Sequence, residues 1–188
     1  LDRTNDLIKV GRYREALDHV DHIGKDLEPF DAHQKARWYL QRGLCLWFSK
    51  DDAEEAALLF LKASQTYPDD ERMAAAGIRG LMLKKDLEGA LAAGREGAER
   101  FPVSVQVWLA HANARMLAGE LIALADAPSA FRDEPDVLQF AAISARARGD
   151  LGEAAKLAEA AVARPGAGFF NRAAFLRFAV EDCSQEPV

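Results

Sequence analysis

A short phrase recurs along this chain of 188 residues, and its spacing constrains the fold more than any other feature. Each copy consists of a turn residue, a few acidic or small residues, and then an apolar run that ends near a proline. The turn residues are spaced by 40, 34, 34 and 30 positions and are Gly11, Asp51, Lys85, Gly119 and Gly149. Two closing prolines, Pro68 and Pro102, are also 34 residues apart. A period of this length is typical of folds built from one repeated supersecondary unit.

The phrase predicts two helices joined by a tight turn. Glycine or a polar residue makes the turn, and acidic residues then occupy the positive end of the second helix. A small residue follows in four of the copies, where it lets the second helix approach its partner closely: Ala16, Ala56, Ala90 and Ala154. Before the turns, apolar residues recur at helical spacing over 38–50, 73–84, 105–118 and 137–148. No segment alternates with period two, so we predict an all-α protein.

This pattern resembles the tetratricopeptide repeat (TPR) family, whose helix pairs span about 34 residues. Trp108, Ala112 and Gly119 match the aromatic, small and turn positions of that family, and Phe60 and Ala63 match its second helix. The resemblance implies a right-handed α-solenoid of about five antiparallel helix pairs. We expect a single repeat domain over 1–188, ending in an aromatic-rich helix near 168–181 and belonging to a longer protein. The unit over 105–135 is short, and Pro128 would break a long second helix there.

Composition narrows the classes of function. The formal charge of −6 and the pI of 5.3 argue against a general nucleic-acid-binding protein. No apolar run approaches the ~20 residues of a membrane-spanning helix. Cys45 and Cys183 are interpreted as free buried thiols, which fits a reducing compartment and a cytoplasmic location. Richness in alanine and arginine suggests a bacterial source.

The candidates for chemistry are weak. His19 and His22 are three residues apart and face one side of a helix, but no third His or Cys nearby completes a metal site. The chain has no GxSxG nucleophile motif and no phosphate-binding glycine loop. Gly94 and Gly97 are better explained by close helix packing than by ligand binding. We therefore predict no catalytic site, no metal and no cofactor.

In the TPR family, the first helices of the pairs line a concave groove that holds peptide segments. Mapped onto this chain, the resemblance implies the following partner-binding residues: Lys9, Gln41, Arg72, Arg79, Met82, Asn113, Met116, Gln139 and Arg146. The arginines would bind a carboxylate, the asparagine a peptide backbone, and the methionines would give adaptable apolar surface.

Three functions remain open at this point. The first is a scaffold or adaptor that binds a protein or peptide segment. The second is the regulatory or substrate-recruiting domain of a larger enzyme, such as a transferase or a signalling effector. The third is self-association, in which one end of the repeat array stacks on another copy.

Overall fold

A computed structural model describes residues 1–49 and 52–167, and throughout this part of the chain the regular structure is helical. This confirms the predicted all-α class. The α-helices run over α1 (Asp2–Lys9), α2 (Tyr13–Ile23), α3 (Ala32–Ser49), α4 (Ala53–Thr66), α5 (Glu71–Leu83), α6 (Leu87–Arg100), α7 (Val105–Leu117), α8 (Pro135–Ala147) and α9 (Leu151–Ala163). The predicted helix near 168–181 and Cys183 lie outside the described residues.

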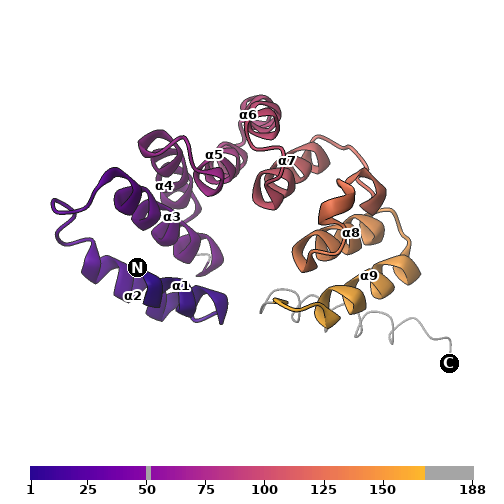
Figure 1. Ribbon diagram of the computed structural model, residues 1–188, viewed down its shortest axis with the longest axis horizontal. Helices are drawn as coiled ribbons and strands as arrows, with labels where there is room; N and C mark the ends of the chain where they lie inside the picture. Colours follow the sequence, from indigo (N-terminus) through magenta and orange to yellow (C-terminus); the bar gives the residue numbers. More distant parts are fainter. Residues whose placement is uncertain (50–51, 168–188) are drawn as a thin grey trace. The chain divides into compact units, whose positions relative to one another are not determined.

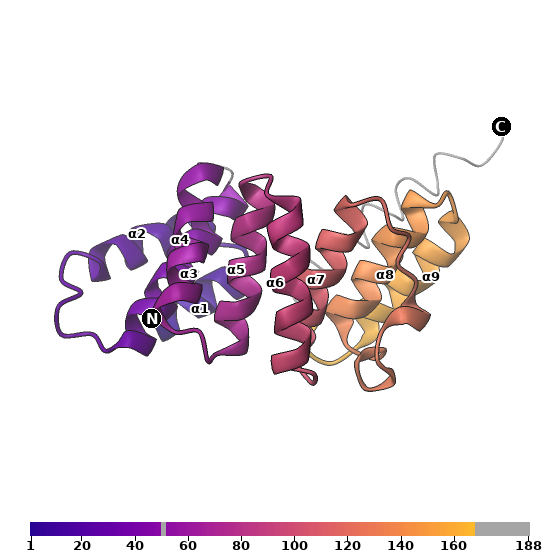
Figure 2. The same ribbon diagram turned by 90° about the horizontal axis from the view of Figure 1, so that it is seen from above.

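The chain divides into two compact units, Leu1–Ala118 and Gly119–Val188. In the first unit each helix packs on the next one along the chain from α1 to α7, and α7 also packs on α5. Figure 1 shows this succession, and Figure 2 shows α4, α5 and α6 side by side. In the second unit, α8 packs on α9. Among the described residues, no helix is both long and apolar enough to cross a membrane.

The turns lie where the repeated phrase predicts them. Gly11, Gly119 and Gly149 have φ angles of 78°, 91° and 84°, and Lys85 has a φ of 61°. A left-handed backbone at this position ends one helix and reverses the chain toward the next. Asp51, the remaining predicted turn residue, lies outside the described residues.

Side-chain caps then start the following helices. The carboxylates of Asp52, Asp86 and Asp150 accept from backbone N–H groups three residues on, at 2.8, 2.9 and 3.0 Å. Asp31 and Gln34 form a reciprocal capping pair at the start of α3. These caps satisfy backbone donors that have no partner inside the helix.

The small residues of the phrase form the contacts within the pairs. Ala16, Ala56 and Ala90 are completely buried, and Ala154 is almost so. The predicted packing role of Gly94 is also confirmed, because a Cβ atom there would lie 2.4 Å from the ring of His111 on α7. The helices of the first unit therefore approach one another through small side chains, which larger ones would push apart.

The fourth predicted pair lacks its second α-helix, and this departs from the expected five pairs. After α7, the chain forms two short 3₁₀ turns, Leu124–Asp126 and Ser129–Phe131. Pro128 lies between them and cannot donate the hydrogen bond that a continuous helix needs. This segment still buries apolar side chains, namely Ile122, Ala127 and Phe131.

Two arginines fix this irregular segment in the second unit. Arg132 donates to the carbonyl oxygens of Ala127 and Ala125, at 2.9 and 2.8 Å. Arg148, at the end of α8, donates to the carbonyl oxygen of Ile122 at 3.1 Å. In a continuous helix, backbone N–H groups would donate to these carbonyl oxygens. Here the two arginine side chains donate to them instead.

A candidate binding face on helices α5 and α7

Helix α5 is partly accessible to solvent on the side predicted to bind a partner. Arg72 is exposed at the start of the helix, and Arg79 and Met82 are half-buried further along it. Most residues between them are buried, as Ala75 and Ala76 illustrate. Arg72 and Arg79 are seven residues apart, which is close to two helical turns, so both arginines lie on one side of α5.

Helix α7 continues this face. Gln106, Asn113 and Met116 are half-buried along it at helical spacing. The guanidinium of Arg79 donates through Nη2 to Oε1 of Gln106, at 3.1 Å, across 27 residues of sequence. This bond joins two residues of the candidate face that come from separate helices. We call the set Arg72, Arg79, Met82, Gln106, Asn113 and Met116 the α5–α7 face.

The α5–α7 face rests on a well-packed core. Met82 packs against a buried cluster contributed by α5, α6 and α7, which comprises Ala75, Ile78, Ala90, Val107, Ala110 and Ala114. At the start of α5, Asp70 accepts from the backbone N–H groups of Arg72 and Met73. The cap and the cluster fix the two helix backbones, so the polar side chains project from a rigid support.

Two of the predicted partner-binding residues lie elsewhere in the first unit. Lys9 is exposed in the last turn of α1, with its Nζ 4.0 Å from a carboxylate oxygen of Asp6. Gln41 is in the core instead of on an open face, because its side chain is only 5% exposed. Its Nε2 donates to the carbonyl oxygen of Leu1 at 3.0 Å. Gln41 therefore fixes α3 to the start of α1 and has no surface to offer a partner.

The remaining two predicted residues belong to the second unit. Gln139 and Arg146 are half-buried on α8, seven residues apart, and Ile143 between them is 41% exposed. These three residues form the accessible stripe of α8, while Val137, Ala141 and Ala145 are buried on other sides of the helix. Gln139 and Arg146 on α8 therefore have the same seven-residue spacing as Arg72 and Arg79 on α5, but they belong to the second unit.

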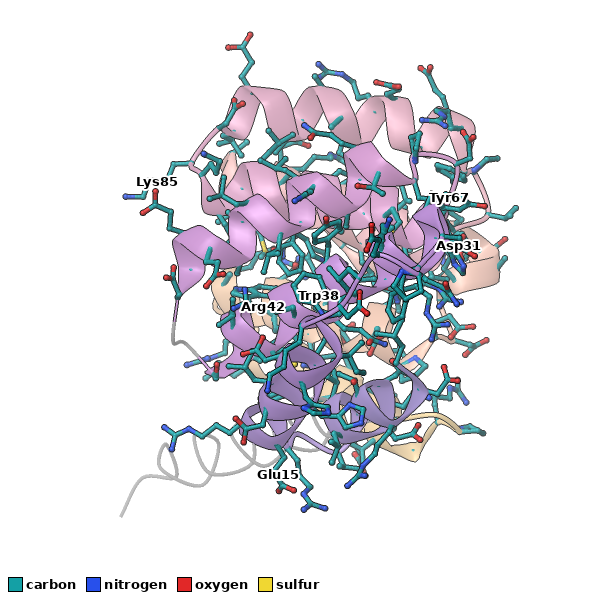
Figure 3. The ribbon with its side chains drawn as sticks, turned by 90° about the vertical axis from the view of Figure 1, so that its left-hand side faces the viewer. Glu15, Asp31, Trp38, Arg42, Tyr67 and Lys85 are labelled. Atoms are coloured by element: carbon teal, nitrogen blue, oxygen red, sulfur yellow. The ribbon has the colours of Figure 1, made fainter. Side chains whose placement is uncertain are left out.

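Sequence reasoning missed an ionic cluster centred on Arg42 of α3. Arg42 donates through Nε to Asp21 of α2 at 2.7 Å and through Nη1 to Glu55 of α4. Its guanidinium lies 5.8 Å from the ring centre of Trp38, and Figure 3 shows the two side chains near each other. Burial alone would lower the pKa of Arg42, but the bonds from the two carboxylates outweigh it and raise the pKa. The two carboxylates are 21 and 13 residues away from Arg42 in sequence, so no local sequence pattern predicts this cluster. The cluster joins three helices.

The histidine and cysteine side chains considered for chemistry contribute instead to contacts between helices or to the core. His19 of α2 bonds through Nδ1 to the buried hydroxyl of Thr4 on α1, at 2.8 Å, and burial lowers the pKa of its imidazole. Cys45 is fully buried, and burial raises the pKa of its thiol to about 12. A thiol with such a pKa is a poor nucleophile near neutral pH. Within the described ranges, no three His, Cys, Asp or Glu side chains are grouped as metal ligands would be.

No family model matches the chain, and no curated protein matches it at a significant level.

Proposed function

We propose that this chain is a TPR-like helical repeat domain, arranged as a solenoid, that binds a peptide or protein segment on its α5–α7 face. It acts as a scaffold or adaptor module and carries out no catalysis of its own. Binding on this face needs no cofactor. The ligand is held by side chains of two first helices that stand next to each other although their sequences are far apart.

The observation that carries the proposal is the bond between Arg79 and Gln106. Both residues occupy the same kind of position, on the accessible side of a first helix, in consecutive repeats. Their contact shows that these sides adjoin, so a single extended ligand can touch both helices. Elongated repeat domains typically use such continuous faces, formed by successive repeats, for binding.

The first test is affinity purification from the native source with the full-length protein that contains this chain. Arg72→Glu and Arg79→Glu, introduced together, reverse the charge on the face, and we expect them to remove the ligand from the purified set. The matched control is Arg14→Glu with Arg95→Glu, which makes the same charge change at exposed residues on α2 and α6. We expect the control to retain the ligand.

Circular dichroism and thermal melting of the same proteins separate binding from folding. Substitutions at exposed residues such as Arg14, Arg72 and Arg95 usually change stability by no more than about 0.5 kcal/mol. Arg79 is half-buried, and its replacement also removes the bond to Gln106, so the melting curve checks that the Arg72/Arg79 variant keeps native helicity. If every co-purified protein is retained by the folded Arg72/Arg79 variant, the α5–α7 face is not the binding surface and the proposal fails.

A further inference from the structure

We draw no further inference here: the strongest candidate, the mostly apolar groove that α4 and α6 form over Ala74, Gly77 and Leu81 of α5, has its charged lining residues Glu96 and Arg100 paired with each other, and nothing in the described part of the chain shows what covers it.

Discussion

The backbone at Lys85 is held in a conformation that glycine tolerates better than lysine does. Lys85 has a φ of 61° at the turn between α5 and α6, whereas the other residues with a positive φ in the described part of the chain are glycines. Figure 3 shows its side chain at the edge of the molecule, pointing outward. We therefore expect Lys85→Gly to stabilise the protein by about 0.5–1 kcal/mol, because it removes the clash of Cβ with its own backbone at a modest entropic cost. Urea unfolding followed by circular dichroism measures this difference.

The converse substitution is the control for the turn at Lys85. Gly149 has a φ of 84° between α8 and α9, and open space surrounds the place where a Cβ atom would lie. Gly149→Ala should therefore cost about 1 kcal/mol through backbone strain alone, with no packing clash. A destabilised Lys85→Gly protein would show that contacts of the lysine side chain outweigh the strain in its backbone.

Single residues also show where sequence reasoning stops. Sequence alone could predict that accessible sides of their helices would contain Arg72, Arg79 and Asn113, because helical periodicity assigns each residue to one side of its helix. Gln41 satisfies the same periodicity but is buried, because the start of α1 covers that side of α3. Which neighbouring helix covers a given side depends on contacts across 40 residues of sequence, and periodicity carries no information about them.

Between elements, close packing within a helix pair gives a sharp prediction at Ala90. This residue is completely buried in α6, where its cluster includes Ile78 of α5 and Val107 of α7. Ala90→Leu should destabilise the protein by about 1–3 kcal/mol, because the added atoms overpack the contact between helices. Ala92→Leu is the matched control, since Ala92 is exposed on the same helix and a leucine there should change stability by no more than about 0.5 kcal/mol. Chemical denaturation of both variants makes the comparison, and equal stability would mean that the repeat register is misassigned.

Most helices could be predicted from sequence because each carries its own start and stop signals. The capping carboxylates of Asp52, Asp86 and Asp150 precede acidic first turns. A left-handed turn residue directly precedes the caps at Asp86 and Asp150. The segment after α7 lacks such signals. Pro128 indicated that a long helix would be broken, but the fixed irregular path depends on Arg132 and Arg148 donating to backbone carbonyls. Arginines that bond to carbonyls have no characteristic spacing in sequence, so this path could not be foreseen.

At the scale of the whole molecule, charge is distributed unevenly between the helices. The sequence contains this pattern, but it can be recognised only when each charged residue is assigned to a helix of the fold. The net charge of the whole chain is negative, and this total hides the excess of basic over acidic residues in α3, α5 and α7. Assigning each charge to a first or second helix separates the two signs. The acidic second helices therefore account for much of the negative net charge of the protein.

The division into two units leads to a prediction about folding. The buried clusters formed around Val107, Cys45, Met73 and Leu46 each lie within Leu1–Ala118, and the cluster around Leu138 lies within Gly119–Val188. A fragment over residues 1–118 thus keeps each of these first-unit clusters intact. We expect it to be helical and to melt in a single cooperative transition, because local helix pairs with their own core can fold without distant segments.

The measurement is circular dichroism and calorimetry of the 1–118 fragment beside the 188-residue chain. The fragment should also keep the slow exchange of the buried amides in α4 and α5, whose helices lie in the middle of the first unit. Ala90→Leu in the fragment provides an internal control, since it should lower the melting temperature of the fragment as it does that of the whole chain. A fragment that is unfolded, or that lacks protected amides in α5, would show that the second unit contributes to the stability of the α5–α7 face.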